Sequence, residues 1–509
     1  MMVESSRLAE PPYIDIMTTD ISLDAVTRRA VSSLRIDNAV EPRTFGFGSG
    51  LARIRSDGDR SFLEVMGSPE LTNVLGRTAT WKRVTEKKTI EVFPPEAVVR
   101  NVLAEPNLAM PRIDRIVSAP VFAVDGSFDS TPGYQPTAGV FFAPPPGLEV
   151  PPIPTTPSAE DVGDALVLIY DDLLVDFPFA DAASRAHALA GMLLPFARNM
   201  IEGPTPMHLI DAPARGSGKT LLAHVMALPS AGTTAVASEA RSEEEWRKRV
   251  GSFLSTGPQV VLIDNLKKHL DSAALDAVLT SDIWVDRLLG RNDRQIRYPN
   301  KALWLATGNG VTLSVDLARR TIPISLDANM ELPDTRPADS FRHRNLRAWA
   351  LRSRGNLVWA CAVLIRHWIA HGRPDGVTPP LGSFESWTAT IGGILEVAHV
   401  DGFLIGHDEF RETFDPESAS WVTFVDRWWN DHGDALVRAG KLADTYDMLD
   451  NDFLHIGAST ARSRSTTLGH ALLNRRNTIH GDYRIVLAGK KNQGGNRWRL
   501  EHITTSRTS

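Results

Sequence analysis

The sequence has a single cysteine, no long hydrophobic run and no excess of positive charge. Cys361 alone cannot form an internal disulfide or a cysteine-based zinc site. Because no stretch of about 20 uninterrupted apolar residues exists, we expect no membrane-spanning helix. The first residues also lack the basic-then-apolar pattern of a signal peptide. These absences predict a cytoplasmic protein that has no zinc module and no membrane partner.

The charge is unevenly distributed along the 509 residues. The whole chain has a net charge of −6, with 42% hydrophobic and 23% charged residues, as in an ordinary globular protein. A length of this order predicts about three or four domains. An acidic balance argues against a nucleic-acid partner, but residues 461–509 contain ten basic and two acidic side chains, a net charge of +8. This end therefore indicates a polyanionic partner, or else a solvated basic tail.

Residues 211–220 read DAPARGSGKT and follow a short apolar run, Met207–Ile210. A strand, a glycine-containing loop and a helix in this order favour phosphate binding, because loop N–H groups and the helix N-terminus attract anions. A proline occupies the first glycine position of GxxxxGK[ST], where its φ near −65° is tolerated. We expect Lys219 to contact the β- and γ-phosphates of ATP and Thr220 to bind Mg²⁺. The predicted nucleotide-binding residues are Pro213, Ala214, Arg215, Gly216, Ser217, Gly218, Lys219 and Thr220.

A second apolar strand, Val260–Asp264, ends in an acid about 45 residues after the phosphate loop. An aspartate at this place holds Mg²⁺ in phosphate-loop ATPases, so Asp264 is the predicted metal residue. Asn265 follows where many such enzymes have the glutamate that polarises the attacking water. The identity of the catalytic base therefore stays open, with Glu239 and Glu243–Glu245 as candidates by proximity in sequence.

A third apolar strand, Ala302–Ala306, precedes Thr307-Gly308-Asn309. A polar residue at the tip of the next parallel strand can orient the attacking water, and Asn309 is the candidate for this role. The sequence DLARR follows. Its arginines, Arg319 and Arg320, are candidates to stabilise negative charge in the transition state, in the same site or in a neighbour's. The alternative is a surface charge patch.

A basic hairpin is predicted just before this third strand. Val285–Leu289 and Gln295–Tyr298 read as strands, and residues 287–301 have a net charge of +4. Arginine forms bidentate contacts with phosphate, so the tip is suited to gripping a DNA backbone inside a pore. The alternative is a structural hairpin with a solvated tip. The predicted DNA contacts are Arg291, Asn292 and Arg294.

The motifs GSGKT, VVLIDN, DRLLGRN, WLATGNG and DLARR in this order resemble an AAA+ ATPase module. More narrowly, the chain is similar to superfamily-III-like, primase-associated helicases of bacteriophages and integrative elements. The similarity is dense from about Val162 to Asp327, and PGYQPTAGVFF and LGSFESW extend it loosely. It implies a hexameric ring with ATP sites between subunits, and an Asp264-Asn265 pair is familiar in the group. It also implies that Arg319 or Arg320 acts in trans. No primase cluster is visible N-terminally, so a separate primase is an expected partner.

The C-terminal end has the order of a winged helix. A helix over Leu468–Leu473 ends in two arginines, and two predicted strands, Tyr483–Ala488 and Arg497–Leu500, enclose a glycine-rich turn. In such a domain the helix enters the major groove of DNA and the wing contacts phosphates. The alternative is a winged helix that only packs against its neighbours. The predicted DNA contacts are Arg475, Arg476, Lys490, Lys491 and Arg497.

These features predict a multidomain α/β protein. Seven of the fourteen residues in 144–157 are prolines, which favours an extended linker. The expected parts are a mixed α+β N-terminal domain of unknown role (1–143), this linker (144–157), an AAA+ P-loop NTPase core with a parallel sheet and flanking helices (158–330), a helical extension (331–420) and a winged-helix-like DNA-binding domain (421–509).

Three functions are compatible with these sequence features. The first is an ATP- and Mg²⁺-dependent DNA helicase or translocase that acts on single-stranded or forked DNA during replication of a phage or mobile element. The second is an ATP-dependent DNA-binding switch, such as an initiator, a loader or a defence regulator, that does not unwind processively. The third is a nucleotide-binding scaffold that hydrolyses ATP poorly because Asn265 replaces a glutamate.

Overall fold

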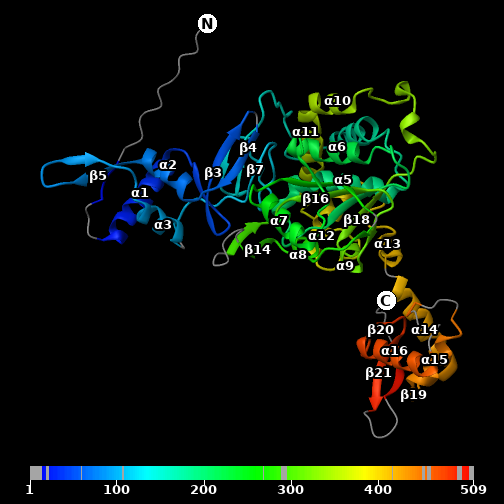
Figure 1. The fold of residues 1–509 in the computed structure, drawn as a ribbon. Coiled ribbons are helices and arrows are strands. Elements are labelled where there is room, and N and C mark those ends of the chain that lie inside the picture. The colour runs from blue at the N-terminus through cyan, green and yellow to red at the C-terminus, as the bar shows by residue number, and fades with distance from the viewer. Residues whose placement is uncertain are drawn as a thin grey trace. The chain divides into compact units, whose positions relative to one another are not determined.

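A computed structural model describes ten stretches of the chain, namely residues 14–18, 22–58, 60–105, 108–267, 269–287, 295–414, 416–449, 453–454, 460–489 and 496–503. The chain divides into two compact units, Met1–His407 and Asp408–Ser509, and each is described by itself (Figure 1). Within the described stretches, no helix combines the length and the apolar character needed to cross a bilayer.

The N-terminal part of the first unit mixes helices with two small sheets of order β1-β5-β6 and β2-β3-β4. Ser22 caps the first helix by accepting a hydrogen bond from the Ala25 N–H at 3.3 Å. The helices share an apolar core that includes the buried Leu71, Trp81 and Val99. The elements are β1 (Ile14–Met17), α1 (Leu23–Val40), β2 (Thr44–Phe47), β3 (Gly50–Asp57), β4 (Arg60–Val65), α2 (Ser68–Thr78), β5 (Ala79–Val84), β6 (Thr89–Glu91) and α3 (Glu96–Ala104).

A third small sheet and the proline-rich segment connect this part to the rest of the unit. The sheet has the order β7-β9-β8, with β7 at Arg115–Val117, β8 at Gly133–Gln135 and β9 at Val140–Phe142. The proline-rich segment packs against helix α11 (Arg354–Ala370), since a Cβ added at Gly355 would lie 1.7 Å from the Glu149 carbonyl oxygen. This close approach fixes the extended segment on the helix surface.

The centre of the first unit is a five-stranded parallel sheet of order β11-β12-β16-β10-β18. Its three middle strands are almost entirely buried, as expected for parallel strands covered on both faces. Helices α5 (Ala182–Ala197) and α6 (Lys219–Ala231) pack against the strands. This sheet confirms the predicted multidomain α/β fold with a parallel sheet and flanking helices. The strands are β10 (Met207–Asp211), β11 (Val236–Ser238), β12 (Val260–Leu266), β16 (Leu303–Gly308) and β18 (Thr321–Ser325).

The sequence around the sheet forms helices with clear start signals. Ser158 and Asp161 form a capping box at the start of α4, with the Ser158 N–H donating to Asp161 Oδ2 at 2.7 Å. A π-helical segment, Leu168–Leu173, and a 3-10 turn, Arg198–Met200, extend two of these helices. The helices are α4 (Ala159–Val167), α5 (Ala182–Ala197), α6 (Lys219–Ala231), α7 (Glu243–Leu254), α8 (Ala273–Leu279) and α9 (Val315–Ala318).

The predicted hairpin before the third strand is present. β14 (Ile283–Arg287) pairs antiparallel with β15 (Gln295–Pro299), and Trp284 lies opposite Tyr298. Both of these aromatic side chains are buried, whereas the neighbouring Val285 is half exposed, so the hairpin presents one face to the protein. Its tip lies outside the described residues. A minor parallel pair, β13 (His269–Leu270) and β17 (Thr312–Leu313), lies nearby in the sequence.

A helical region follows β18. Trp368 is buried, and Trp349 and Trp359 are partly buried against the main apolar core, so all three side chains pack within the fold. The elements are the 3-10 turns Pro333–Thr335 and Ala338–Ser340 and the helices α10 (Leu346–Arg352), α11, α12 (Glu385–Val397) and α13 (His407–Thr413).

The second unit has helices and a small antiparallel sheet of order β19-β22-β21-β20. Three buried tryptophans, Trp421, Trp428 and Trp498, dominate its core. The predicted helix and hairpin are present, although the helix begins earlier than expected. The elements are α14 (Pro416–His432), β19 (Val437–Arg438), α15 (Ala439–Tyr446), α16 (Ala461–Asn474), β20 (Ile479–His480), β21 (Tyr483–Gly489) and β22 (Arg497–His502).

Candidate nucleotide site and DNA-contact residues

The loop between β10 and α6 has the backbone form that phosphate binding requires. Gly216 and Gly218 have φ values of 78° and 88°, which side chains with a Cβ rarely adopt. Gly218 lies directly before α6, so the loop delivers its N–H groups to the positive end of that helix. Pro213 and Arg215 are exposed on this loop, and Ala214 and Ser217 are joined by a 3.2 Å hydrogen bond.

Lys219 is held inside the loop. Its Nζ donates hydrogen bonds to the Ala214 carbonyl oxygen at 3.1 Å and to Ser217 Oγ at 3.0 Å. Burial lowers the pKa of Lys219, while the nearby carboxylates of Asp211 and Asp264 raise it. A buried cation in a loop that precedes a helix N-terminus has a strong attraction for phosphate.

Asp264 is the acceptor in a cluster of two hydroxyl groups. Its Oδ1 accepts hydrogen bonds from Thr220 Oγ1 at 2.8 Å and from Thr307 Oγ1 at 2.5 Å. These three residues come from the start of α6 and from the ends of β12 and β16. The structure therefore brings together the two predicted metal residues, Thr220 and Asp264, with a third residue that sequence reasoning did not select.

The Thr220–Asp264 pair suits Mg²⁺. This ion is normally bound by one or two protein ligands together with phosphate oxygens and water. In the described part of the chain, no three His, Cys, Asp or Glu side chains converge on a metal site. A single carboxylate and a hydroxyl beside a phosphate loop thus fit the way Mg²⁺ accompanies a nucleotide.

Asn265 lies in a bulge at the end of β12. Its φ is 61°, and the strand register shifts between Ile263 and Leu266. Asparagine tolerates this left-handed conformation better than glutamate does, which gives a local reason for the residue found here. The Asn265 N–H donates to Thr307 Oγ1 at 2.9 Å, while the residue itself is exposed.

Asn309 and Asp211 meet at the neighbouring strand ends. Asn309 Oδ1 is buried and has no hydrogen-bond donor among the described residues. Asp211 accepts a 3.5 Å hydrogen bond from the Val311 N–H, and burial raises the pKa of its carboxyl group. Asp211 therefore anchors the turn that carries Asn309. Sequence reasoning missed this role because Asp211 reads only as the end of a strand.

Only one of the candidate glutamates lies at the nucleotide edge of the sheet. Glu239 directly follows β11, where Ser238 is in register with Asp264, and it accepts a hydrogen bond from the Lys267 N–H at 3.1 Å. The other three candidates have partners away from this edge. Glu243 accepts hydrogen bonds from the Ser272 hydroxyl and the Ala274 N–H. Glu244 forms an ion pair with Lys248, and Glu245 forms one with Arg249.

A cavity of about 260 Å³ lies beside the phosphate loop. Gly218, Phe177 and Phe341 contribute to its lining, and the Arg336 guanidinium lies 4.6 Å from the centre of the Phe341 ring. A cavity next to a phosphate loop that combines aromatic rings with charged and polar side chains suits a nucleoside. Sequence reasoning did not select these residues, because they are far from the phosphate loop in the sequence and form no motif.

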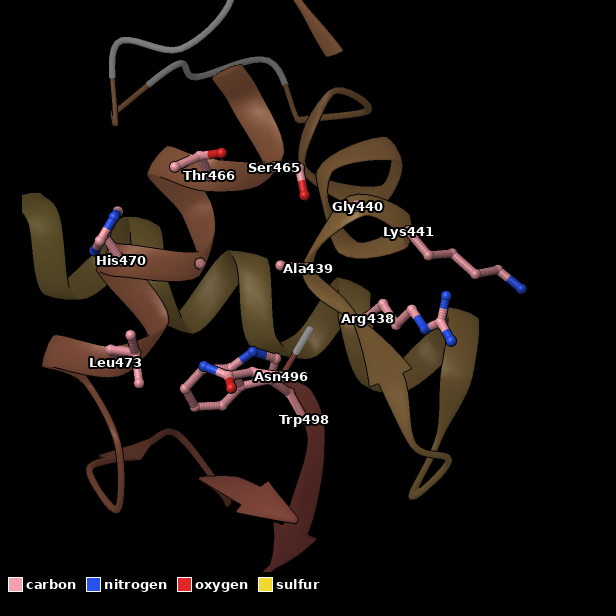
Figure 2. A pocket seen from close by; sticks show the side chains of 11 residues that line it. Arg438, Ala439, Gly440, Lys441, Ser465, Thr466, His470, Leu473, Asn496 and Trp498 are labelled. Atoms are coloured by element: carbon pink, nitrogen blue, oxygen red, sulfur yellow. The ribbon is translucent and has the colours of Figure 1, made fainter. Parts of the chain in front are cut away.

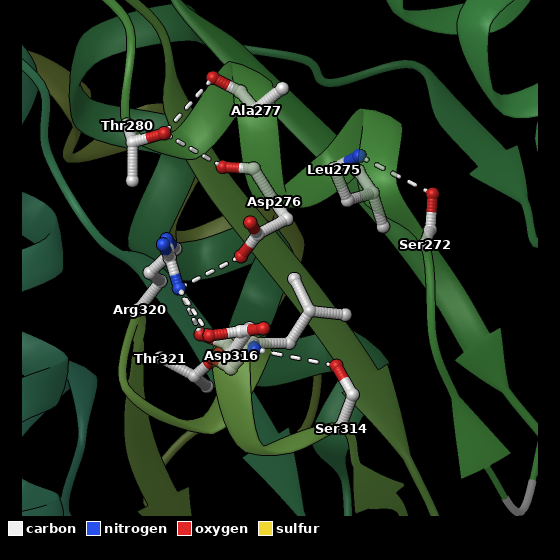
Figure 3. Close-up of polar contacts among 10 residues, drawn as sticks. Ser272, Leu275, Asp276, Ala277, Thr280, Ser314, Asp316, Arg320 and Thr321 are labelled. Atoms are coloured by element: carbon white, nitrogen blue, oxygen red, sulfur yellow. Dashed lines mark hydrogen bonds and ion pairs between the residues drawn. The ribbon is translucent and has the colours of Figure 1, made fainter. Parts of the chain in front are cut away.

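The two adjacent arginines have different environments. Arg320 Nη1 lies 2.8 Å from Asp276 Oδ1 on α8 and 3.7 Å from Asp316 Oδ1 on α9, so it joins two helices (Figure 3). Arg319 is exposed, and no hydrogen bond or ion pair joins its side chain to a described residue. Arg319 is therefore the arginine available to an external partner.

Neither arginine lies near the phosphate loop of its own chain. Both precede β18, whose first residue, Thr321, is in register with Met207 at the start of β10. The loop leaves the opposite end of β10 after Asp211, four residues further along, which corresponds to about 13 Å of strand. An action of Arg319 on a nucleotide therefore requires a second copy of the chain.

The predicted DNA contacts on the hairpin, Arg291, Asn292 and Arg294, lie outside the described residues. Its described arms expose Arg287 and Arg297. The base of the hairpin contacts the N-terminal sheet, because the Phe47 and Tyr298 rings stack with centroids 5.5 Å apart.

The predicted contacts of the second unit have different surroundings. The Arg475 guanidinium lies 5.8 Å from the ring centre of the buried Trp421, which gives it a packing role. Arg476 and Arg497 are exposed. Lys490 and Lys491 lie outside the described residues.

No family model matches the chain, and no curated protein matches it either. Solved structures similar to it include the C-terminal region of NrS-1 in its apo form, with 11% identity over 93% of this chain and 99% of that one and a TM-score of 0.37. Cch of SCCmec type IV, described as an active helicase, has 10% identity over 89% of this chain and 91% of that one, with a TM-score of 0.32. JCV helicase has 16% identity over 52% and 71%, with a TM-score of 0.21. Two of these three proteins thus carry the name helicase, at identities and TM-scores too low to transfer an activity.

Proposed function

We propose that the chain is an ATP-dependent DNA helicase or translocase that works as a ring, most simply a hexamer, in replication of a phage or mobile element. In this proposal residues 158–330 form an AAA+ ATPase core, 331–420 its helical extension and 421–509 a winged-helix DNA-binding domain. The observation that carries it is the cluster at Asp264, whose Oδ1 accepts hydrogen bonds from both Thr220 and Thr307 beside Lys219.

The residues fit ATP with Mg²⁺. Lys219 would contact the phosphates, and Thr220 and Asp264 would hold the metal, which when bound neutralises charge on the phosphate oxygens. The buried Asn309 Oδ1 needs a donor, which a water molecule beside the nucleotide would provide. Glu239 would serve as the base for that water. The order of the sheet, β11-β12-β16-β10-β18, also supports an AAA+ core, since it brings the tips of β12 and β16 next to the phosphate loop.

The position of Arg319 supports the proposal of a ring. It is exposed at the edge of the sheet opposite to the phosphate loop, so only a neighbouring subunit can offer it a nucleotide. An arginine supplied in this way stabilises transition-state charge and is worth roughly 10³–10⁵ in turnover in other phosphoryl-transfer enzymes. The ATP site would then be complete only between two copies.

DNA contact is proposed at two places. The basic hairpin β14–β15 would face the strand within the ring. The second unit has the order helix, strand, helix, helix, short strand and hairpin, which supports a winged helix, and it exposes Arg476 and Arg497. Such contacts neutralise phosphates, so DNA binding would weaken as salt rises.

ATP turnover measured with and without single-stranded DNA tests the proposal. We expect turnover by the wild type, stimulation by DNA, and loss of both in Lys219→Ala. Negative-stain images with ATP and DNA should contain rings with a central channel. Full turnover in Lys219→Ala, or monomers only under turnover conditions, would overturn this function.

A DNA-binding switch without processive unwinding is the second candidate, and Asn265 favours it. In place of a glutamate, the site has an exposed asparagine in a left-handed bulge. Slow hydrolysis would suit an initiator or loader that changes state once per event. A forked duplex separates the two functions, because only the helicase displaces a strand repeatedly.

A further inference from the structure

Asp334 lies against the phosphate loop, although the two are far apart in the sequence. A Cβ added at Gly216 would lie 2.9 Å from the Asp334 Cβ and 3.1 Å from its backbone nitrogen. Asp334 belongs to the 3-10 turn Pro333–Thr335, and it also lines the cavity of about 260 Å³ beside the loop. Its carboxylate is therefore next to the loop at the cavity that suits a nucleoside.

Contacts with Asp176 hold the segment that carries Asp334. Arg336 Nη1 donates to the Asp176 carbonyl oxygen at 3.0 Å, and the Arg342 N–H donates to Asp176 Oδ2 at 2.8 Å. Pro333, directly before Asp334, is buried. The position of Asp334 at the loop is therefore fixed from both sides of the turn, by a buried neighbour before it and by these hydrogen bonds after it.

The Asp334 carboxylate is open to a ligand. It is exposed, and no hydrogen bond or ion pair joins it to a described residue. Among the described residues that line the cavity, the other carboxylate is that of Asp176, which already accepts a hydrogen bond. A carboxylate at this place repels the phosphates of a bound nucleotide, and hydrogen bonds from the same nucleotide would offset the repulsion. Asp334 therefore indicates a ligand with donor groups close to its phosphates.

A cavity in the second unit shows why the direction of a charged side chain matters. It has a volume of about 500 Å³ and lies between the start of α15, one face of α16 and the start of β22, but the charged ends of Arg438 and Lys441 point away from its other lining residues (Figure 2). Charged groups that point outward offer no contact to a molecule inside. Asp334 differs, because its contact with Gly216 places it at the loop that would hold the ligand.

The aromatic side chains of the cavity leave the sugar of a nucleotide to Asp334. Phe177 lies beside Gly218, 3.4 Å from an added Cβ, whereas Asp334 lies beside Gly216. Phe341 also lines the cavity. Aromatic rings stack on bases, and the ribose joins the base to the phosphates. The ribose hydroxyl groups are therefore the donors of a nucleotide that come closest to a carboxylate on the loop.

We propose that Asp334 accepts hydrogen bonds from the 2′- and 3′-hydroxyl groups of the ribose and so makes the site selective for ribonucleotides. The proposal rests on the function proposed above, since it takes ATP as the ligand. The two oxygens of a carboxylate can accept from both hydroxyl groups at once, and an acidic residue binds the ribose in other nucleotide-binding folds. A deoxynucleotide lacks one donor, so it leaves one carboxylate oxygen beside the phosphates without a partner.

Turnover of ATP, 2′-dATP and 3′-dATP by the full-length chain tests this role. We expect kcat/KM of the wild type to be about tenfold higher with ATP than with either deoxy analogue, because a hydrogen bond to a charged group is lost. The difference should appear in KM, since the ribose contact is the same before and during the reaction. Asp334→Ala should use the three nucleotides equally. Asp339→Ala is the matched control, because Asp339 is exposed on the next 3-10 turn, Ala338–Ser340, and does not line the cavity.

Calorimetric titration with ADP and 2′-dADP gives the same comparison without hydrolysis, so slow turnover does not hide the result. The wild type and Asp339→Ala should bind 2′-dADP about tenfold more weakly than ADP, and Asp334→Ala should bind both equally. A wild type that binds ADP and 2′-dADP equally would overturn the role of Asp334 while the nucleotide site stands, and so would a preference for ADP that remains in Asp334→Ala. A wild type that binds no nucleotide would overturn the function proposed above as well.

Discussion

Thr307 Oγ1 lies 2.5 Å from Asp264 Oδ1, and the same hydroxyl accepts a hydrogen bond from the Asn265 N–H at 2.9 Å. Thr307 therefore links the tip of β16 to the end of β12, where the predicted metal residue is found. A hydroxyl that both donates and accepts fixes the orientation of the carboxylate and of the bulge beside it. Together with Thr220, Thr307 therefore positions Asp264.

Replacing Thr307 with valine tests this role. The Thr307→Val variant keeps the side-chain shape but removes the donor to Asp264 and the acceptor for Asn265. We expect ATP turnover to fall about tenfold, corresponding to about 1.4 kcal/mol of transition-state stabilisation, and the Mg²⁺ concentration for half-maximal turnover to rise. Thr256→Val is the matched control, because its hydroxyl donates only to the Phe253 carbonyl oxygen. Equal turnover and Mg²⁺ dependence in both variants would remove Thr307 from the site.

Substitutions of the two adjacent arginines, Arg319 and Arg320, should have different effects. Arg319→Ala should abolish turnover without lowering the melting temperature, because the Arg319 side chain is exposed and has no hydrogen bond or ion pair to a described residue. Arg320→Ala should lower stability by about 1–3 kcal/mol, since it leaves Asp276 without its partner at 2.8 Å. Thermal melting and ATP turnover of both variants distinguish these effects.

Mixing inactive variants tests whether Arg319 acts between subunits. Lys219→Ala and Arg319→Ala each disable a different half of an interface site, so a mixture contains some intact interfaces. Turnover should reappear in the mixture. An inactive mixture, in which exchange of subunits is verified by mass, would contradict an arginine supplied in trans.

Acid sensitivity should come from buried histidines. Burial lowers the pKa of His208 to about 3 and that of His187 to about 4, well below 6.5. Between about pH 3 and 6.5 the unfolded chain binds more protons than the folded chain, so stability falls as pH falls through this window, by up to about 1.4 kcal/mol per pH unit for each histidine. His208→Leu should flatten the fall in melting temperature below pH 6.5, and a change at the exposed His371 should not. If the melting temperature of His208→Leu fell with pH as steeply as that of the wild type, buried neutral His208 would not be a cause of the acid sensitivity.

The contact between the N-terminal sheet and the basic hairpin makes a prediction about coupling. A Cβ added at Gly48 would lie 1.5 Å from the Arg297 carbonyl oxygen, so Gly48→Ala must push the hairpin away. We expect DNA stimulation of ATP turnover to fall while turnover without DNA is retained. Gly58→Ala is the matched control, since Gly58 has nearly the same φ, 59° against 56°, and no atom within 4 Å of an added Cβ. Equal stimulation of ATP turnover by DNA in both variants would show that this contact does not couple DNA binding to ATP hydrolysis.

Local pattern was sufficient to predict the strand, the loop and the helix that carry the candidate phosphate-binding residues. The apolar run Met207–Ile210 and the motif GSGKT identified the strand, the loop and the helix, and the spacing to Asp264 identified β12, which β16 separates from β10 in the sheet. The residues that pattern could not identify act through tertiary contact. Asp211 and Thr307 read as ordinary strand ends, and their roles depend on the order in which β10, β12 and β16 lie in the sheet.

The sequence also could not distinguish the roles of adjacent residues of the same type. Arg319 and Arg320 differ only in what the fold places next to them, namely solvent for one and Asp276 for the other. The same is true of Arg475, which was predicted to contact DNA and lies over the Trp421 ring. The two-residue strand β19 is too short to predict, because it exists only through its pairing with β22.

Strand displacement on a forked DNA duplex is the most direct test of the proposed function. The account predicts that the wild type displaces a labelled strand when ATP and Mg²⁺ are present, and that Lys219→Ala, which lacks the cation within the phosphate loop, displaces none. A wild type that hydrolyses ATP and binds the fork but releases no strand would contradict the helicase, as would displacement by Lys219→Ala at the wild-type rate.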